Sequence, residues 1–441
     1  MTERTLDSEP QLGAAGGRGR VAGRRGRARP SRHAKPRVCV LLPVHWSAIM
    51  GGSQYQAKLL IERLLERYDV DVHYLTVDCE PDHRPDGYAL HRFSSRDGVR
   101  RHGYFFDALR LYRALRALRP DVVYQQVGCA HTGIAAWYAS RNGVPMVWRV
   151  SSDRSVTPER IPWWRLHRRI ERAFLEYGIR KADVILAQTK AQQSRLAAHY
   201  GRADAEVVPN FHPGAPPPQR GRRRGSVVWI ANLKPLKNPH AFVRLAAAFG
   251  ADAPVRFVMI GAAMRNDAWT RDLLRAIDAV PNLEYLGART QDEVGEVLAD
   301  ARVLVNTSDY EGFSNTFIQA WMLEVPVVSL RVDPDGVLRD QHLGFLSGTE
   351  DRLRRDVRRL VEDEELSIEI GRRCREHALR HHSMRNADRI AALLGLPPKP
   401  LVGSEVDGPA GPDPNEPKRP RAPAAAMPRP FAHAPDAPLR Q

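Results

Sequence analysis

Two stretches of this sequence combine residue types that suit a ligand carrying both phosphate and hydroxyl groups. The first contains Glu311 and Gly312 followed by Phe313-Ser314-Asn315-Thr316, and the second contains Lys234 and Lys237. A carboxylate accepts hydrogen bonds from hydroxyl groups, and lysine ammonium groups bind phosphates as point charges. Together these groups would suit a nucleotide diphosphate that carries a hydroxylated group.

The elements around Glu311 are expected to place these groups at the end of a strand. The apolar run 303–305 predicts a buried parallel strand, and the apolar residues of 317–323 recur at helical spacing. Ser314, Asn315 and Thr316 suit the cap of this helix, and Gly312 lets a ligand approach the backbone. A strand, a glycine loop and a helix N-terminus in this order form an anion site, because the first N–H groups of the helix are unpaired.

Short apolar strands alternate with helices along most of the chain, which predicts parallel sheets covered on both faces. The Pro/Gly/Arg-rich segment 213–225 separates two such alternations. We therefore expect an α/β protein with an N-terminal domain at 36–212 and a C-terminal domain at 226–396. The flanking segments, a basic tail at 1–35 and a Pro/Ala-rich tail at 397–441, are predicted to be disordered.

The N-terminal domain also places polar residues after strands. Gly51 and Gly52 lie between a predicted strand at 38–42 and a predicted helix at 53–67, a geometry that accepts a phosphate or a sugar. His45 lies in the same loop. His131 and Asp153 follow two further predicted strands, and ligands of such sheets bind beyond the carboxyl ends of the strands. A lone histidine is more often structural than catalytic, so both interpretations stay open for His131.

Composition restricts the remaining function classes. The net charge of +16 is divided between the tail 1–36 (+6), the segment 398–441 (+1) and the body (+9), which fits an anionic ligand, an anionic membrane surface or nucleic acid. The four cysteines are scattered, which argues against zinc and against a disulfide framework and favours a reducing, cytoplasmic location. No apolar run reaches the length of a membrane span, and the N-terminus lacks a secretory signal. We find no nucleic-acid-binding motif.

The segment 162–182 has two interpretations. It combines Trp163 and Trp164 with Arg165, Arg168, Arg169 and Arg172 above an apolar face, a composition typical of interfacial membrane helices. An ordinary packed helix with an arginine-lined outer face has the same pattern. The first interpretation predicts contact between residues 163–172 and an anionic membrane, and thus a peripheral location on the inner face of the membrane.

These residues resemble the retaining, GT-B-fold glycosyltransferases of glycosyltransferase family 4, which use nucleotide-sugar donors. The resemblance covers about 37–394. Its most specific element is the stretch 307–321 with the Glu-Val-Pro-Val-Val that follows, which looks like the Glu-x7-Glu region of the family and the strand behind it. Supporting elements are the Gly51-Gly52 loop, His131, the strand 181–189, Val208-Pro209-Asn210 and the loop with Lys234 and Lys237. The resemblance implies two Rossmann-like, doubly wound domains facing a central cleft, the first for the acceptor and the second for the donor.

The resemblance also implies roles for single residues. Glu311 would lie against the transferred sugar, where it holds hydroxyl groups and stabilises positive charge at the anomeric carbon. The residues expected to bind the donor sugar and diphosphate are Gly51, Gly52, Asn232, Lys234, Lys237, Gly312, Phe313, Ser314, Asn315, Thr316 and Gln319. His131 matches a histidine near donor and acceptor, and Glu311, His131 and Lys237 are the expected catalytic residues. Asp153 and His45 are expected to line the acceptor side.

One position departs from the family pattern. The second glutamate of the motif, which in relatives binds the nucleotide ribose, is Gln319 here. An amide offers one acceptor oxygen and no charge, so the lost charge-assisted hydrogen bond would cost about 1–2 kcal/mol of donor affinity. This substitution keeps a catalytically degenerate protein among the alternatives.

The expected activity is transfer of a hexose-type sugar from a UDP- or GDP-sugar to a glycan or lipid-linked acceptor, with retention of anomeric configuration, in polysaccharide or glycolipid biosynthesis. No Asp-x-Asp motif comes directly after a predicted strand, so we expect no obligatory metal and no other cofactor. The alternatives are a nucleotide-sugar epimerase of the same fold and a nucleotide-sugar-binding protein without activity. Net charge alone supports a nucleic-acid binder, which ranks last.

Overall fold

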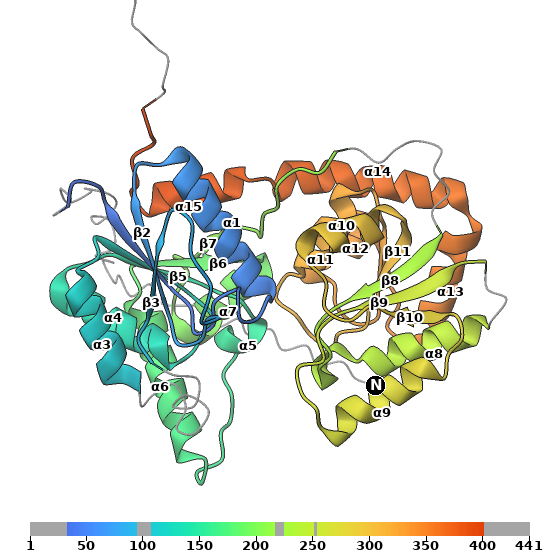
Figure 1. Ribbon diagram of the computed structural model, residues 1–441, viewed down its shortest axis with the longest axis horizontal. Coiled ribbons are helices and arrows are strands. Elements are labelled where there is room, and N and C mark those ends of the chain that lie inside the picture. The colour runs from blue at the N-terminus through green and yellow to red at the C-terminus, as the bar shows by residue number, and fades with distance from the viewer. Residues whose placement is uncertain (1–32, 95–106, 217–224, 251–253, 401–441) are drawn as a thin grey trace, which may run out of the picture. The chain divides into compact units, whose positions relative to one another are not determined.

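Two parallel β-sheets, each formed by one half of the chain, make up the framework of the protein (Figure 1). The computed structural model describes residues 33–94, 107–216, 225–250 and 254–400, and the described residues up to Lys399 belong to one compact unit. Most of the two predicted tails and most of the predicted linker lie outside these ranges.

The first sheet has seven strands in the order β3-β2-β1-β4-β5-β6-β7, and every neighbouring pair is parallel. The strands are β1 (Arg37–Leu41), β2 (Asp71–Thr76), β3 (Ala89–Arg92), β4 (Val122–Gln126), β5 (Met146–Arg149), β6 (Val184–Ala187) and β7 (Glu206–Val207). The predicted strand at 38–42 corresponds to β1, and the strand expected within 181–189 corresponds to β6. Their near-continuous apolar runs are buried because helices cover both faces.

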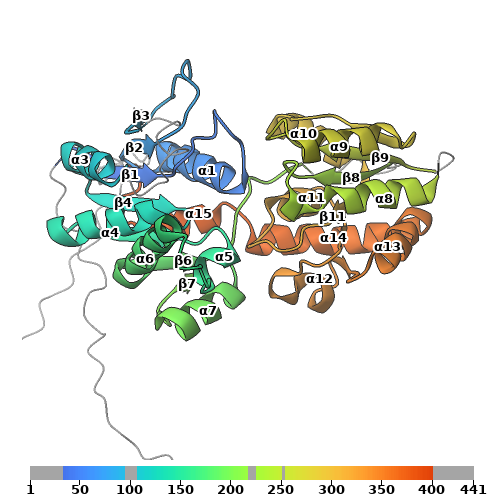
Figure 2. The ribbon, with the colours of Figure 1, turned by 90° about the horizontal axis from the view of Figure 1, so that it is seen from below.

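Helices cover the first sheet on two faces that form separate apolar cores (Figures 1 and 2). The helices of this half are α1 (Gly52–Arg67), α3 (Ala108–Leu118), α4 (Ala130–Asn142), α5 (Asp153–Val156), α6 (Leu166–Lys181) and α7 (Lys190–Tyr200). The apolar side chains of α1 belong to one core. Those of α3, α4 and α6 belong to the core on the opposite face.

The second sheet has six parallel strands in the order β10-β9-β8-β11-β12-β13. The strands are β8 (Ser226–Ile230), β9 (Arg256–Ile260), β10 (Leu283–Tyr285), β11 (Ala301–Asn306), β12 (Val327–Ser329) and β13 (Gly344–Leu346). The helices of this half are the 3₁₀ helices η2 (Pro235–Lys237) and η3 (Pro334–Gly336) and the α-helices α8 (Pro239–Phe249), α9 (Ala268–Asp278), α10 (Gln291–Ala299), α11 (Asn315–Met322), α12 (Val337–Asp340), α13 (Glu350–Glu362) and α14 (Glu364–His381).

The last described helix, α15 (Arg385–Leu393), belongs to the first half of the molecule. The predicted domain boundary at 396 assigned it to the second domain. Its buried residues Ala387, Ile390 and Ala391 instead complete the core beside α1. The guanidinium of Arg63 on α1 donates two hydrogen bonds of 2.8 Å to the carboxylate of Asp388. The sequence of an amphipathic helix shows that it has an apolar face, but it does not show which apolar surface of the protein that face packs against.

Both sheets reverse their strand order next to their first strand, and these switch points define where a ligand binds in a doubly wound fold. In the first sheet β1 lies between β2 and β4, and in the second β8 lies between β9 and β11. Gly51 ends the loop that follows β1, and Gly52 and His131 lie in the first turns of α1 and α4, the helices that follow β1 and β4. The loops that follow β8 and β11 carry Lys237 and Glu311.

Candidate active site

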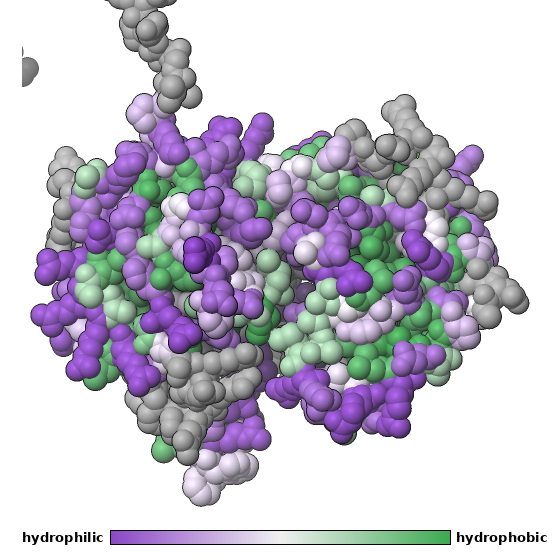
Figure 3. Space-filling view, viewed as in Figure 1, coloured by the Kyte–Doolittle hydropathy of each residue, from purple (hydrophilic) through white to green (hydrophobic). Residues whose placement is uncertain are grey.

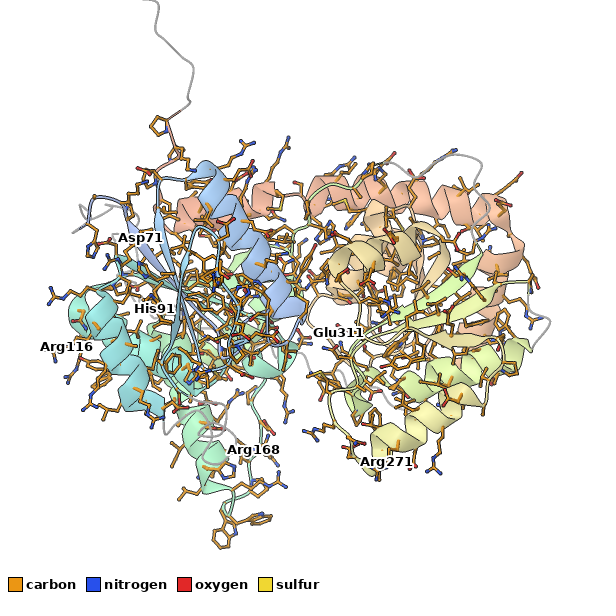
Figure 4. All side chains as sticks on the ribbon, viewed as in Figure 1. Asp71, His91, Arg116, Arg168, Arg271 and Glu311 are labelled. Atoms are coloured by element: carbon orange, nitrogen blue, oxygen red, sulfur yellow. The ribbon has the colours of Figure 1, made fainter. Side chains whose placement is uncertain are left out.

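Glu311, which is labelled in Figure 4, forms an ion pair with Lys237 beyond the carboxyl ends of β8 and β11. The Lys237 ammonium lies 2.9 Å from Oε1 of Glu311. The Asn306 amide and the Ser308 hydroxyl donate hydrogen bonds of 3.0 and 2.6 Å to the same oxygen. Asn306 is the last residue of β11, so the buried strand fixes one of the donors that orient the carboxylate.

The surroundings of Glu311 keep it ionised. Burial by itself would raise the pKa of this carboxyl, but the charge of Lys237 and the three hydrogen bonds from Ser308, Lys237 and Asn306 outweigh burial and lower the pKa below its ordinary value. At neutral pH Glu311 is therefore an anion. It can accept hydrogen bonds and stabilise positive charge, and it has no proton to donate.

The basic loop after β8 contributes a second cation. Lys234 is an exposed residue, yet partial desolvation of its amine, together with the nearby charges of Lys237 and Arg265, lowers its pKa. Asn232 occupies the turn between these elements: its oxygen accepts a hydrogen bond from the Ala262 N–H at 3.2 Å, and its amide donates to the Met50 carbonyl at 3.4 Å. An anion bound here would relieve the repulsion that Lys234 experiences from Lys237 and Arg265.

Neutral buried side chains of the first half hold the loop 312–315. Gln188, next to the end of β6, accepts a hydrogen bond from the Phe313 N–H at 3.2 Å. Asn210 donates to the Phe313 carbonyl at 3.1 Å and to Oδ1 of Asn315 at 2.9 Å. The buried guanidinium of Arg149 donates to Oδ1 of Asn210 at 2.9 Å and orients that amide. Hydrogen bonds from the side-chain amides of Gln188 and Asn210 thus fix the loop beside Glu311.

The backbone at Gly312 and at Gly52 lies so close to neighbouring side chains that a Cβ atom would collide with them. A Cβ atom at Gly312 would lie 2.6 Å from the Gln188 side-chain oxygen and 3.2 Å from the Ser151 carbonyl. A Cβ atom at Gly52 would lie 2.9 Å from the side-chain nitrogen of Asn315, and that nitrogen donates to the Gly52 carbonyl at 2.8 Å. Both predicted glycine loops are therefore in close contact with the residues around Glu311.

The start of α11 differs from the predicted cap. Ser314 is the N-cap residue, but its side chain makes no capping hydrogen bond; its hydroxyl lies 2.8 Å from that of Thr316. Asn315 uses its amide for the contact with Gly52. The cap therefore leaves room at the first turn for an external hydrogen-bond acceptor.

The two candidate histidines are buried and neutral. The ring nitrogens of His45 lie 2.8 Å from the Ser47 hydroxyl and 2.9 Å from the Tyr88 hydroxyl, so this side chain holds the loop after β1. His131 lies in the first turn of α4 and contacts Phe93 edge to face, with 5.3 Å between ring centroids. Burial lowers the pKa of both imidazoles to about 3.

Asp153 belongs to the same hydrogen-bond network as Gln188, which holds the Gly312 loop. Its carboxylate pairs with Arg195 and accepts a hydrogen bond from Gln192 at 2.9 Å. The Gln192 oxygen in turn accepts from the Gln188 N–H at 2.8 Å. Asp153 thus lies behind the Gly312 loop.

Sequence analysis singled out Glu311 and Lys237 but missed the side chains that fix them. Asn306, Ser308, Gln188, Asn210 and Arg149 were not among the candidate site residues. A usable signal was present for two of them, because Gln188 and Asn210 both follow strands within stretches that supported the family resemblance. Arg149 offered no signal, since an arginine at the end of a buried strand is indistinguishable in sequence from a surface residue.

Two family models match consecutive parts of this chain. One, described as Glycosyltransferase Family 4, covers residues 50–213, and the other, described as Glycosyl transferases group 1, covers residues 224–363. The chain belongs to glycosyltransferase family 4. The boundary between the two models falls within the predicted linker, and the Glu311 loop lies in the second.

Curated relatives of this family-4 chain are distant and only partly covered. A GDP-mannose-dependent alpha-mannosyltransferase of Mycobacterium tuberculosis is 28% identical over 259 residues, which are 55% of this chain and 65% of the relative. A D-inositol 3-phosphate glycosyltransferase of Streptomyces bingchenggensis is 26% identical over 226 residues, which are 45% of this chain and 50% of the relative.

Solved structures share the fold of this family-4 chain across nearly their whole length. HepE of Anabaena, crystallised with UDP and glucose, superposes with a TM-score of 0.64 at 16% identity and covers 82% of this chain and 99% of its own. WaaG, a glycosyltransferase involved in lipopolysaccharide biosynthesis, gives a TM-score of 0.65 at 14% identity, with 81% and 99% covered. At these identities the likeness establishes the GT-B fold, two Rossmann-like α/β domains.

Gln319, the departure from the family motif, is already engaged in this structure. Its amide donates a 2.6 Å hydrogen bond to the side-chain oxygen of Gln291, the first residue of α10. Because amides can present either end, the Gln319–Gln291 pair is a neutral group that can both donate to and accept from a ligand hydroxyl.

Two further properties concern metal ions and the membrane. Within the described parts of the chain, no group of three or more His, Cys, Asp or Glu residues is placed to hold a metal ion. Among the same residues, no helix combines the length and the apolar character needed to cross a bilayer.

Proposed function

We propose that this family-4 chain transfers a sugar from a UDP- or GDP-sugar to a glycan or lipid-linked acceptor, with retention of anomeric configuration, in polysaccharide or glycolipid biosynthesis. The observation that carries the proposal is the Glu311–Lys237 ion pair beside the Gly312 loop. The names of similar proteins support the donor class: one is a GDP-mannose-dependent mannosyltransferase, and HepE was crystallised with UDP and glucose.

Glu311 acts electrostatically in this proposal. Its lowered pKa keeps it ionised, so it holds sugar hydroxyl groups and stabilises the positive charge that develops at the anomeric carbon. A protonated carboxyl would have been the signature of a general acid, as in hydrolysis of a glycoside. The ionised state favours transfer from a donor whose leaving group is already anionic.

Lys237, Lys234 and the first turn of α11 stabilise the departing diphosphate. The bond between the anomeric carbon and the β-phosphate oxygen breaks, and the acceptor hydroxyl oxygen bonds to the anomeric carbon from the same face. The proton of that hydroxyl passes to the released phosphate oxygen. Every step uses the two substrates and the side chains named here, and we propose that no metal or other cofactor is required.

In this proposal, the first half of the chain brings its backbone close to the donor site and supplies uncharged hydrogen-bonding groups there. Gly52 places its backbone beside Asn315, and Gly51 precedes it at the start of α1, as the loop of a phosphate-binding site requires. His131, with its pKa near 3, stays uncharged and does not compete with Lys237 for the donor phosphates. We propose that the acceptor binds on this side.

Incubation of the full-length chain with a panel of UDP- and GDP-sugars and glycan or lipid-linked acceptors tests the proposal. We expect donor consumption and an α-linked product from an α-linked donor by NMR, unchanged by EDTA. Glu311→Gln should reduce the rate by about 10²–10³-fold. The matched control Glu296→Gln, an exposed carboxyl on α10, should retain the parent rate.

Other outcomes identify the alternatives. Epimerised donor in the absence of acceptor would indicate an epimerase. Donor binding by calorimetry without turnover would indicate a degenerate binding protein, for which the Gln319 substitution is the motivating observation. If donor is consumed equally by Glu311→Gln and the parent, the proposed site is wrong.

A further inference from the structure

The N-terminal end of α6 exposes two tryptophans and a leucine. Residues 163–167 are all exposed, and the exposed fractions of Trp163, Trp164 and Leu166 are 76%, 66% and 62%. The two indole rings contact each other edge to face, 6.0 Å apart. Figure 1 shows the chain before α6 reaching away from the first sheet, and Figure 4 shows Arg168 in the same region. We call residues 163–168 the tip.

The part of α6 that follows the tip packs against α4 and the core, and this packing does not involve the side chains of the tip. α6 and α4 approach closely through two glycines: a Cβ atom at Gly133 would lie 2.2 Å from the Phe174 carbonyl oxygen, and one at Gly178 would lie 2.7 Å from the Thr132 backbone. Leu175 and Ile179 are buried in the core. The exposed side chains of the tip therefore contribute little to folding, and their presence calls for another explanation.

Arg172 does not belong to the surface predicted for residues 163–172. Its guanidinium bonds Glu176 at 2.9 Å, the Thr157 carbonyl at 3.0 Å and the Tyr200 hydroxyl. These contacts fasten the segment before the tip to α6 and α7. The accessible cations are Arg165 and Arg169, while Arg168 shares the carboxylate of Glu159 with Arg154.

A row of arginines on α3 extends the positive charge along the same side of the sheet. Arg110, Arg113, Arg116 and Arg119 are exposed, and residues 108–119 contain no acid. Leu109 beside them is 58% exposed. α3, α4 and α6 pack into the same core, so α3 and the tip belong to one face of the first sheet. In Figure 3 the projection below this half is pale at its end and strongly hydrophilic around it.

We propose that the tip and the arginine row of α3 dock on an anionic lipid bilayer. Indole rings favour the boundary between headgroups and acyl chains, and arginine side chains reach back to the phosphates. The positive charge of both parts complements an anionic surface, and residues 154–172 alone carry six arginines against two glutamates. A nucleic acid would match the arginines but not the solvent-facing apolar trio. This inference is independent of the proposed transferase activity.

Co-sedimentation with vesicles tests the proposal, using the full-length chain at low salt. We expect binding to vesicles containing 30% phosphatidylglycerol (about a third anionic lipid), and much weaker binding to pure phosphatidylcholine. Trp163→Ser/Trp164→Ser/Leu166→Ser should weaken binding to the anionic vesicles by about tenfold or more. Arg110→Ser/Arg113→Ser/Arg116→Ser should weaken it by about a hundredfold, and added salt should remove that difference.

Matched controls come from the second half of the chain. Ile368→Ser/Leu379→Ser replaces exposed apolar residues of α14, and Arg271→Ser/Arg275→Ser/Arg352→Ser replaces exposed arginines; both should bind like the parent. All variants keep the basic tail, so differences between them report on the docking surface. Glu311→Gln should bind vesicles fully, which separates this proposal from the transferase.

Two results would overturn the proposal. The first is equal vesicle binding by the tryptophan variant and the parent. This result would mean that the arginines bind any polyanion and that the tip has no part in it. The second is equal binding to anionic and neutral vesicles. Unchanged circular dichroism and melting temperature in each variant show that a lost interaction is not a lost fold.

Discussion

The two halves of this protein share a strand order but differ in what their switch-point loops carry. In the second half, Lys237 and Glu311 form a charged pair, and Lys234 adds a cation. In the first half, the corresponding segments carry two glycines and two histidines, His45 in the loop after β1 and His131 in the first turn of α4. Burial keeps both histidines neutral. The same topology thus presents charge on one side and uncharged backbone and amides on the other.

This difference suits a reaction in which one substrate is a polyanion and the other is a neutral hydroxyl compound. The cations are placed where a diphosphate would leave, and the first half approaches closely through Gly52 and holds the Gly312 loop through the uncharged amides of Gln188 and Asn210. A charged residue in the first-half loops would compete for the same phosphates. Substitutions at Lys237, Gly312, Gln319 and His131 test this difference between the halves.

The largest effect is expected for Lys237. Lys237→Met should lower turnover of the donor by about 10²–10³-fold, because it removes a phosphate contact and leaves Glu311 buried without its cation. Lys234→Met, at an exposed position, should cost only about tenfold. Steady-state rates with the best donor measure both. If the pair acts as a unit, Lys237→Met/Glu311→Gln will be hardly slower than either single variant.

Gly312 should show the next largest effect. In Gly312→Ala the added methyl group would lie 2.6 Å from the Gln188 oxygen and 3.0 Å from the Gln192 nitrogen, so the amide network that holds the loop must shift. We expect a loss of about 10–100-fold in kcat/KM, from displacement of the first turn of α11. Gly214→Ala, where a Cβ atom meets nothing within 4 Å, is the control. Equal rates for the two variants would contradict this role of Gln188.

Gln319→Glu should act in the opposite direction. A carboxylate restores the charge-assisted hydrogen bond to a ribose hydroxyl, and Gln291 can turn its amide to donate to it. The KM for the donor should fall by about tenfold with little change in kcat, measured alongside calorimetric titration of the free nucleotide. An unchanged nucleotide affinity would mean that the Gln319–Gln291 pair serves α10–α11 packing alone.

The smallest effect concerns pH and contrasts the two regions directly. The pKa of His131 falls from 6.5 in the unfolded chain to about 3 in the fold, so the unfolded chain binds more protons between these values. Stability contributed by neutral His131 is therefore complete above pH 6.5 and decreases as the pH falls, by about 1 kcal/mol per pH unit below 6. His131→Asn should flatten the curve of melting temperature against pH between 7.5 and 5.

Glu311 supplies the control for that measurement. Its pKa is lowered from an ordinary value of 4.5, so its stabilising pair is complete above pH 4.5 and is lost only as the pH falls through the still lower folded-state value. Glu311→Gln should shift the melting temperature by the same amount at pH 7.5 and at pH 5. A changed slope in that variant would show that Glu311 titrates in this range.

The sequence predicted the framework because it is encoded locally. The buried strand β11, the Gly312 loop and the start of α11 follow from an apolar run, a glycine and a helical repeat within one short stretch. Strand β3 escaped prediction because its four residues are only partly buried or exposed and carry no apolar run. The placement of α15 could not be predicted locally, because its packing partner α1 lies at the other end of the chain.

The candidate site likewise has a part that local sequence patterns predict and a part that they do not. Local sequence patterns place Glu311, Gly312, Lys234 and Lys237 after strands of one parallel sheet, and parallel strands bring their carboxyl ends to one edge. Which groups form hydrogen bonds there follows from the three-dimensional packing. Gln188 and Phe313 are 125 residues apart and meet through a hydrogen bond, and Arg149 orients Asn210 from inside the first core. Such contacts depend on burial and on long-range geometry, which no local pattern of residue types records.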